Sequence, residues 1–585
     1  MNNDNTHAVH WDAVYDVVVV GSGAGAMTAA LRAHDQGLSV LMVEKAAEYG
    51  GTTAISGGGI WIPCNDQIEG LGGSDSRAEA QAYLRATVGE DYDPARMEAY
   101  LEQGPRMVGY LAAQAQTYFR AVPRYPDYYP ELEGGKPGYR TMEPASFDAA
   151  RLGEEFQRLR APSPATLIAG RIAMTQVEAH TILAKEPGWL WLTARLGLGY
   201  MADLRWRRRT PRDRRLTLGN ALVASLRAAM LARGIELWLQ TPMRALHSHD
   251  GKVSGVRVER EGRPLNVRAA FGVILGCGGF EANQLMREQY LPSPTRAEWT
   301  AAPPINHGDG IRAGLEQGAG VALMSHTWGA PTVHVPGEEK QRALFVERAF
   351  PRCIMVNGNG RRFVNEAAPY PDIIYAMYAD QQRAGTNVPA WLIFDAEYRK
   401  RYPCGVLLPG SVQPDSKIPE GWLDNVIYRA DSLAALADKI GVDAAGLEQS
   451  VSRLNQQAAQ GVDEDFGKGA SLFDRYYGDS NCQPNPCLGP LERAPYYALR
   501  IDAGELGTKG GLCTDADARV LRPDGSVIEG LYAIGNTSAA LMGKTYPGPG
   551  STIGPAMTFG YIAANHLACQ VPIEQPDIVT EGATH

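Results

Sequence analysis

Tyrosine is the residue type of this chain that could most clearly take part in a reaction. The sequence contains 26 tyrosines and only 12 phenylalanines, and several of the tyrosines are clustered. One cluster lies within 125–129, another tyrosine follows Pro369, and a pair occupies 476–477. Most tyrosines are structural, since the ring packs and the hydroxyl finds a partner. A phenol can also donate a hydrogen bond to a ketone oxygen, and a phenolate, with an ordinary pKa of about 10, is a stronger base than imidazole. Two phenols in an apolar site would therefore suit the enolisation of a ketone.

A glycine turn near the N-terminus is the second candidate for chemistry. Residues 15–20 predict a buried parallel strand, 27–36 a helix, and 38–43 a second strand that ends at an acid. Glycines in the turn allow a pyrophosphate to approach the backbone, and the helix N-terminus offers free N–H groups. The acid can accept hydrogen bonds from ribose hydroxyls. The dinucleotide-binding residues predicted from this unit are Gly21, Ser22, Gly23, Gly25, Ala26, Glu44 and Lys45.

Segment 50–59 indicates which dinucleotide is bound. It is a polar, glycine-dense loop directly after the ribose-binding strand. An isoalloxazine ring needs several backbone donors and close approach, and such a loop supplies both. A flexible linker is the alternative interpretation. The flavin contacts predicted here are Gly51, Thr52, Thr53, Ser56, Gly57 and Gly58.

Two later segments, 272–279 and 530–536, each combine a short apolar strand with a glycine-containing end. Because they lie far apart in the chain, the dinucleotide domain is expected to be discontinuous, with another domain inserted. The cofactor contacts expected from these strand ends are Gly278, Gly279, Gly535 and Asn536.

Segment 546–564 begins Tyr-Pro-Gly-Pro-Gly and continues as a predicted helix. Pro555 suits the first turn of that helix, and Ser551 or Thr552 would cap it. The positive helix N-terminus would face the N1/O2 edge of a flavin and stabilise its anionic reduced form by about 1–2 kcal/mol. Thr552 and Ile553 are therefore predicted cofactor contacts. A structural Pro/Gly turn is the alternative.

Together these blocks resemble the flavin-dependent 3-ketosteroid dehydrogenases of the Δ1 type, relatives of the fumarate reductase and succinate dehydrogenase flavoproteins. The resemblance covers about residues 15–567, and the Tyr-Pro-Gly-Pro-Gly segment is far more specific than the glycine turn. It implies FAD and an α/β fold, with a discontinuous Rossmann-like FAD-binding domain and an inserted α+β substrate domain. The domains expected are 1–325, with an excursion at about 155–215, then 326–507 and 508–585.

The resemblance also implies roles for individual residues. Tyr546 and the amide of Gly550 would hold the C3 carbonyl oxygen of a 3-ketosteroid. Tyr370, which follows an Asn-Glu-Ala-Ala-Pro sequence, would be the base at C2. Tyr128, in a Pro-Asp-Tyr-Tyr sequence, would support that base, and Phe345 would form an apolar wall.

The implied reaction is desaturation of the C1–C2 bond, with N5 of FAD accepting hydride from C1 and an unnamed electron acceptor reoxidising the flavin. Asp309, in a segment resembling a flavin-side loop of the family, would contact the cofactor or serve the structure. One alternative is a 3-oxo-5α-steroid 4-dehydrogenase. Another is a fumarate-reductase-like enzyme for unsaturated carboxylates, which would need arginine or histidine around the carboxylate.

Composition excludes several other classes. The formal charge of -9 argues against a nucleic-acid partner. The 8 cysteines form no C-x-x-C pair, and neither a clustered metal-ligand set nor a nucleophile elbow is present, so no metal is expected. Residues 1–13 are polar and lack the apolar stretch of a secretory signal, which favours a cytoplasmic location.

Segment 189–215 is unusual for an acidic chain. It begins with tryptophans and leucines and ends with a run in which seven of eleven residues, 205–215, are arginine. A solvated, ion-paired surface excursion is one interpretation. The other is a peripheral membrane contact, with aromatic rings at the headgroup level and arginines on anionic lipid.

Overall fold

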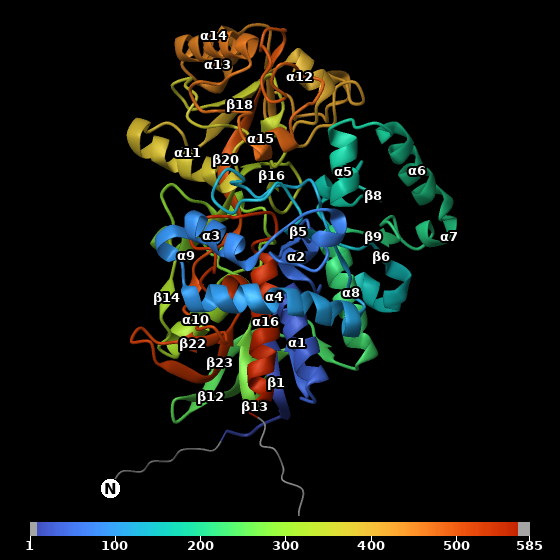
Figure 1. Ribbon diagram of the computed structural model, residues 1–585, viewed down its shortest axis with the longest axis vertical. Helices are drawn as coiled ribbons and strands as arrows, with labels where there is room; N and C mark the ends of the chain where they lie inside the picture. Colours follow the sequence, from blue (N-terminus) through green and yellow to red (C-terminus); the bar gives the residue numbers. More distant parts are fainter. Residues whose placement is uncertain (1–8, 571–585) are drawn as a thin grey trace, which may run out of the picture.

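A mixed eight-stranded sheet forms the lower half of the molecule (Figure 1), and the computed structural model describes residues 9–570. The strands run in the order β10-β2-β1-β13-β12-β11, and β23 and β22 continue from β13. Their bounds are β1 (Ala13–Val20), β2 (Val40–Val43), β10 (Glu236–Trp238), β11 (Met243–His249), β12 (Lys252–Arg260), β13 (Arg263–Leu275), β22 (Arg519–Leu521) and β23 (Val527–Ala533).

The central strands of this sheet are parallel and end at one edge. Val20 of β1 is in register with Val43 of β2 and Leu275 of β13. Leu275 is in turn in register with Ala533 of β23, a strand from the far end of the chain. The turns after β1, β13 and β23 therefore meet at the same place, where ligands bind in sheets of this kind.

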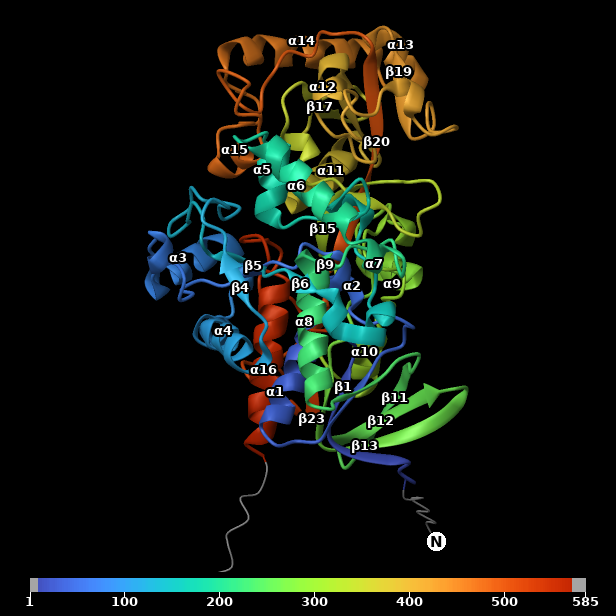
Figure 2. The same cartoon turned by 90° about the vertical axis from the view of Figure 1, so that its right-hand side faces the viewer.

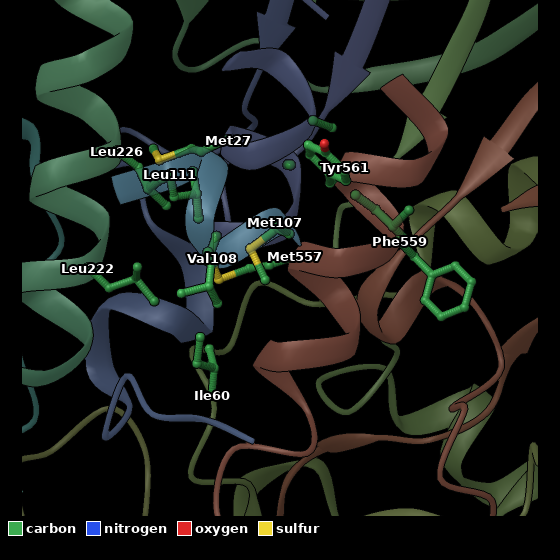
Figure 3. Close-up of a cluster of buried hydrophobic side chains, with 14 of the residues drawn as sticks. Met27, Ile60, Met107, Val108, Leu111, Leu222, Leu226, Met557, Phe559 and Tyr561 are labelled. Carbon is green, nitrogen blue, oxygen red and sulfur yellow. The ribbon is translucent and has the colours of Figure 1, made fainter. Parts of the chain in front are cut away.

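Helices α1, α4, α8 and α16 pack together on one face of the sheet. Figure 3 shows Met27, Leu111, Leu226 and Met557, one from each helix, in a shared apolar core. All four side chains are fully buried. This core fixes the start of α1 and the start of α16 relative to the sheet edge. The helix bounds are α1 (Ala24–Asp35), α4 (Pro94–Ala115), α8 (Leu218–Ala232) and α16 (Ile553–Ala568).

A second sheet, in the order β16-β15-β20-β18-β17 with β19 beside β20, lies above the first (Figure 2). Strand β20 reaches down from it toward the lower half (Figure 1). The elements are β15 (Thr327–Val333), β16 (Arg342–Ala343), β17 (Cys353–Val356), α11 (Tyr370–Ala384), β18 (Ala390–Asp395), α12 (Ala396–Arg401), β19 (Ile427–Ala430), α13 (Leu433–Ile440), α14 (Ala444–Gln460), α15 (Leu472–Tyr476) and β20 (Tyr496–Thr508).

Smaller elements complete the surroundings of the sheet edge. A three-stranded sheet, β3-β5-β4, lies beside the start of α16. These elements are α2 (Gly51–Ile55), β3 (Ile60–Trp61), α3 (Arg77–Val88), β4 (Phe119–Ala121), β5 (Thr141–Pro144), β6 (Phe147–Asp148), β7 (Leu167–Ile168), β8 (Ile172–Ala173), β9 (Arg215–Leu216), α9 (Gln284–Tyr290), α10 (Asp309–Glu316), β14 (Val321–Ala322) and β21 (Gly511–Leu512).

The excursion expected at about 155–215 contains three helices on one flank of the molecule (Figure 1). They are α5 (Gln176–Leu183), α6 (Trp189–Ala202) and α7 (Leu204–Arg207), and none of their residues is buried. Within residues 9–570, none of the helices has the length and apolar character to cross a bilayer.

Three local predictions were wrong. The first helix starts at Ala24 rather than 27, directly after the turn. Half of the expected loop 50–59 is the short helix α2. Thr552 stands at the N-cap of α16, but its backbone is already helical and its hydroxyl caps nothing. That hydroxyl donates instead to the Tyr546 hydroxyl, at 3.1 Å.

Candidate active site

One cavity of about 480 Å³ opens where the parallel strands end. It extends from the glycine turn after β1 to Tyr128, Tyr370 and Tyr546. Of the predicted site residues, Gly279 alone lies outside its lining and packs against Thr508 and Glu281. The predicted residues that line it are Gly21, Ser22, Gly23, Gly25, Ala26, Glu44, Lys45, Gly51, Thr52, Thr53, Ser56, Gly57, Gly58, Tyr128, Gly278, Asp309, Phe345, Tyr370, Gly535, Asn536, Tyr546, Gly550, Thr552 and Ile553.

The lower part of the cavity has the geometry of a dinucleotide cradle. Gly21 has a φ of +103°, and a Cβ there would lie 2.3 Å from the carbonyl oxygen of Gly276. Helix α1 begins at this turn with Gly23 as its N-cap, a residue with no side chain to cap the helix. The amide of Ala24 donates to Thr53 Oγ1 at 3.2 Å, whereas the amides of Gly25 and Ala26 have no partner among the described residues and are available to a phosphate. The donor set fits FAD at this place.

At the end of β2 the cradle contains charged side chains that are held by hydrogen bonds and an ion pair. Glu44 is buried, accepts a hydrogen bond from Ser22 Oγ at 2.6 Å and another from the amide of Ala46 at 2.9 Å. Lys45 forms an ion pair with Asp309 at the start of α10. Burial alone would raise the pKa of Asp309, but the hydrogen bond and charge of Lys45 outweigh it, so the pKa is lowered. Asp309 therefore holds Lys45 beside the cavity.

Sequence reasoning missed several residues of this lower part. Thr241 lies in the turn between β10 and β11, and Met243 is the first residue of β11, where the side chains carry no recognisable pattern. Asn306 lines the cavity and donates to Thr52 Oγ1 and to Glu281 Oε1. The sequence offered one indication of Asn306, because it lies three residues before Asp309 in the segment that resembles a flavin-side loop.

Three tyrosines from distant segments form one cluster at the upper end of the cavity. The ring centroids of Tyr128 and Tyr546 are 5.1 Å apart, those of Tyr128 and Tyr370 5.6 Å, and those of Tyr370 and Tyr546 5.4 Å. The ring of Phe345 lies 5.3 Å from that of Tyr370. The sequence-predicted phenols are thus brought together in one aromatic site.

The Tyr-Pro-Gly-Pro-Gly loop is held by hydrogen bonds to its carbonyl groups. The amide of Tyr128 donates to Pro547 O at 2.9 Å, and the hydroxyl of Tyr83 donates to the same oxygen at 2.5 Å. Thr141 Oγ1 donates to Pro549 O at 3.0 Å. These contacts fix the loop against Tyr128.

Gly550 ends this loop in a conformation that favours glycine. Its φ is +99°, and a Cβ there would lie 2.6 Å from the backbone of Ile60. Its amide faces the hydroxyl oxygen of Tyr546. The phenol of Tyr546 and the amide of Gly550 therefore lie side by side at the upper end of the cavity.

A buried ion network anchors Tyr128. The neighbouring Asp127 accepts from Trp61 Nε1 at 2.7 Å and from Arg140 Nη1 at 2.8 Å. Arg140 also pairs with Asp75, and all three charged side chains are almost fully inaccessible to solvent. Breaking a buried pair of this kind costs about 3–5 kcal/mol, so the Pro-Asp-Tyr-Tyr segment is firmly placed.

A second network anchors Tyr370, the first residue of α11. Glu366, four residues earlier, is fully buried and takes two hydrogen bonds from Arg362, each of 2.8 Å. Asn365 donates to Asp474 at 2.9 Å and accepts from the amide of Ala367. The Asn-Glu sequence that precedes the tyrosine is therefore structural support for it.

Burial raises the pKa of all three tyrosines. For Tyr128 and Tyr370 the pKa lies well above its ordinary value, because an ionised phenolate loses water there and the other phenols crowd it. Burial also raises the pKa of Tyr546, and hydrogen bonds from Thr552, Tyr370 and the amide of Gly550 oppose the rise. Tyr546 is thus suited to donate its proton in a hydrogen bond.

More aromatic residues line the upper cavity than were predicted. Tyr125 stacks on Tyr476, with centroids 4.6 Å apart, and its hydroxyl is 2.6 Å from that of Tyr477. His180 of α5 stacks on the other side, 4.2 Å from the ring of Tyr476. The tyrosine clusters were a visible signal, whereas nothing around His180 indicated that the excursion reaches the cavity.

Comparison with known proteins defines the family. The FAD binding domain model matches residues 16–553. A 3-oxosteroid 1-dehydrogenase of Mycobacterium tuberculosis (strain ATCC 25618 / H37Rv) is 44% identical over 567 residues, covering 95% of this chain and 98% of that protein. The chain belongs to the FAD-dependent 3-ketosteroid Δ1-dehydrogenase family. This confirms the family expected from the sequence, and FAD as its cofactor.

Two further similarities are to a solved structure and to a dehydrogenase named for another substrate. The crystal structure of 3-ketosteroid delta1-dehydrogenase from Sterolibacterium denitrificans in complex with 1,4-androstadiene-3,17-dione is similar, with a TM-score of 0.93 and 54% identity over 95% of this chain and 99% of that chain. A 4-oxocyclohexanecarboxylate 2-dehydrogenase of Sinomonas cyclohexanicum is 36% identical over 570 residues, covering 95% of this chain and 93% of that protein. The mixed α/β, FAD-binding type of fold is therefore confirmed.

Proposed function

We propose that this protein is a 3-oxosteroid 1-dehydrogenase, which removes hydrogen from C1 and C2 of 3-ketosteroids. One observation carries this proposal: Tyr128, Tyr370, Tyr546 and the amide of Gly550 converge at the end of the FAD cavity. The family relationship supports the same activity. The tyrosine end is aromatic, which suits an apolar ring ketone.

Polarisation of the ketone is the first task of the site. Tyr546 Oη and the amide of Gly550 donate hydrogen bonds to the C3 oxygen, where negative charge develops as the ketone enolises. Removing one donor of such a pair costs about 10²–10³ in rate. Thr552, by donating to the Tyr546 oxygen, leaves the phenol proton free for the substrate.

Proton removal from C2 is the second task. Tyr370 takes the proton on its phenolate oxygen, and Tyr128 stabilises that oxygen by a hydrogen bond. When bound, FAD supplies the oxidant that accepts the C1 hydrogen with its electron pair. The electron acceptor that follows is a second substrate of unassigned chemistry.

The domain division belongs to the proposal. Residues 1–325 and 508–585 would form the Rossmann-like FAD-binding domain, and 326–507 the inserted α+β substrate domain. Pairing of β23 with β13 supports it, because this pairing joins the two ends of the chain in one sheet. The second sheet, formed within 327–508, supports an inserted domain.

Phenylalanine variants test the two main roles. We expect Tyr546→Phe and Tyr370→Phe to bind FAD normally, while steroid-driven flavin reduction slows at least about 100-fold in each. Anaerobic stopped-flow absorbance measures this. Tyr290→Phe, outside the cavity lining, is the control and should reduce at the wild-type rate. Near wild-type reduction by either cavity variant would remove that tyrosine from the mechanism.

We also propose that α6 and α7 contact an anionic membrane surface. Leu190, Trp191 and Leu204 are 60–70% exposed. Arg205, Arg208 and Arg209 are exposed and, within residues 9–570, form no ion pair. By contrast, Arg214 and Arg215 pair with carboxylates, so the ion-paired interpretation holds for the end of the run alone. Apolar and cationic groups side by side suit a lipid interface.

Sedimentation with phosphatidylglycerol vesicles tests this contact. We expect binding at low salt that weakens at moderate salt, and weaker binding by Trp191→Ser and Arg205→Gln. Leu285→Ser, which alters an equally exposed leucine on α9, should bind like wild type. A lack of wild-type binding at low salt would contradict the membrane proposal without affecting the proposed reaction.

A further inference from the structure

Arg348 is a buried cation directly behind the tyrosine cluster. Its side chain is 1% exposed. Nε donates to Leu344 O at 3.1 Å and Nη2 to Phe345 O at 3.2 Å. Nη1 donates to Glu366 O at 2.5 Å and to Ala368 O at 3.0 Å. Every nitrogen is satisfied, and every acceptor is a neutral main-chain carbonyl.

These contacts join two segments of the cavity wall. Phe345 belongs to the cavity wall and Leu344 to the core directly behind it, whereas 366–368 form the turn that leads into Pro369, the N-cap of α11. Tyr370 is the next residue, and its ring packs edge-on against Phe345. The guanidinium therefore fixes the position of the expected base relative to the wall of the substrate site.

The charge of Arg348 is not neutralised by an ion pair anywhere in residues 9–570. The titratable groups that face it are Glu347 on its own segment, Tyr128, Tyr370, Tyr477, Asp372 and Asp474. Tyr370 in turn faces the phenols Tyr125, Tyr128, Tyr477 and Tyr546. Burial raises the pKa of Glu347, Asp372 and Asp474 and so disfavours their negative charges, which leaves Arg348 as the one cation among these groups to face a Tyr370 phenolate.

The proposed reaction requires that the Tyr370 phenolate be stabilised, and a nearby positive charge does this. Burial disfavours the phenolate of Tyr370, the form that must accept a proton. A buried opposite charge favours the ionised form. Asp474 lies nearby, but burial raises its pKa, so its negative charge is also disfavoured.

We propose that Arg348 is a positioning residue for proton transfer, an inference that rests on the proposed function. It fixes Tyr370 against Phe345 and places a positive charge behind the Tyr370 phenolate. In the step it supports, the proton passes from steroid C2 to the Tyr370 oxygen. The C–H electron pair stays with the substrate as the enolate held by Tyr546 and Gly550, and the guanidinium is unchanged.

Exchange of the C2 hydrogens with deuterated solvent isolates this step. The enzyme is reduced with dithionite beforehand, so that a 3-keto-4-ene steroid binds but is not oxidised, and mass spectrometry follows deuterium uptake against pH. We expect Arg348→Gln to raise the pH midpoint of exchange by at least about one unit and to slow exchange about 10-fold at pH 7. Arg348→Lys, which keeps the charge, should stay within about 0.3 unit of wild type.

Arg399→Gln is the control, because Arg399 is equally buried, donates to the carbonyls of Leu408 and Gln413, pairs with Asp415 and lies outside the cavity lining. Its midpoint should equal that of wild type. An unshifted midpoint in Arg348→Gln, or a shift in Arg348→Lys as large as in Arg348→Gln, would overturn the charge role. If Arg348→Gln does not retain FAD, Arg348→Lys still tests the inference, because a raised pH midpoint of exchange in Arg348→Lys would contradict it.

Failure of the proposed function would look different. In that case wild type would show no exchange, or Tyr370→Phe would exchange as fast as wild type. Exchange could instead be normal and depend on Tyr370 but be the same with and without the charge at residue 348. That result would contradict the inference about Arg348 and leave the proposed function intact.

Discussion

The hydroxyl of Thr552 contacts Tyr546, so a change at residue 552 should alter how well Tyr546 donates its proton to the ketone. It donates to the Tyr546 oxygen at 3.1 Å instead of capping α16. A net hydrogen bond is worth about 0.5–1.5 kcal/mol, so Thr552→Val should lower kcat/KM for the steroid up to about 10-fold. FAD content, measured by absorbance, should not change. A loss as large as that of Tyr546→Phe, or no loss, would contradict this role.

Glu281 gives a prediction about pH and stability. It is fully buried, its Oε2 has no partner among the described residues, and burial raises its pKa to about 7 from an ordinary 4.5. Between pH 4.5 and 7 the folded protein therefore binds more protons than the unfolded chain, and stability falls as pH rises. The loss is at most about 3 kcal/mol. Glu281→Gln should remove it.

Thermal melting of the FAD-loaded protein at pH 5 and pH 8 measures the difference. Wild type should lose more in Tm between these values than Glu281→Gln. Parallel losses in the two proteins would show that Glu281 is not protonated in the fold.

At the scale of elements, Gly550 joins the Tyr-Pro-Gly-Pro-Gly loop to β3. With a φ of +99° and the backbone of Ile60 2.6 Å from a Cβ, Gly550→Ala must displace the amide. We expect steroid-driven reduction to fall at least about 100-fold, as for the loss of one oxyanion donor. Gly70→Ala, in open space, is the control. Wild-type rates in Gly550→Ala would show that this amide does not hold the ketone.

Elements with a local signal could be predicted, and those set by distant contacts could not. The valines of β1 predict a strand and the glycines after it predict a turn, and neither prediction depends on contacts with distant residues. The start of α2 and the hydrogen bond that the Thr552 hydroxyl donates to Tyr546 depend on the surrounding structure. The same holds for the candidate site. Tyr128, Tyr370 and Tyr546 stand in distinctive motifs, whereas His180 and Arg348 do not.

Over the whole molecule, the two sheets have separate tasks. The parallel strands bring three glycine-containing ends to one edge, where the dinucleotide cradle forms. The upper half supplies Tyr370 and Phe345, and the Tyr-Pro-Gly-Pro-Gly loop next to α16 supplies Tyr546. The proposed reaction site therefore requires both halves together. Helix α5 closes one side of it with His180, so the excursion links the site to the exposed face of α6 and α7.

The position of the new double bond tests the central claim most directly. The FAD-loaded protein is mixed without oxygen with a 3-keto-4-ene steroid, a 5α-reduced 3-ketosteroid or 4-oxocyclohexanecarboxylate, and products are analysed by NMR and mass spectrometry. We predict bleaching of the flavin by the 4-ene steroid and a 1,4-diene as its product, one molecule per FAD. Reduction by the carboxylate alone, or a double bond formed at C4–C5 of the 5α-steroid with no reaction at C1–C2, would contradict the account.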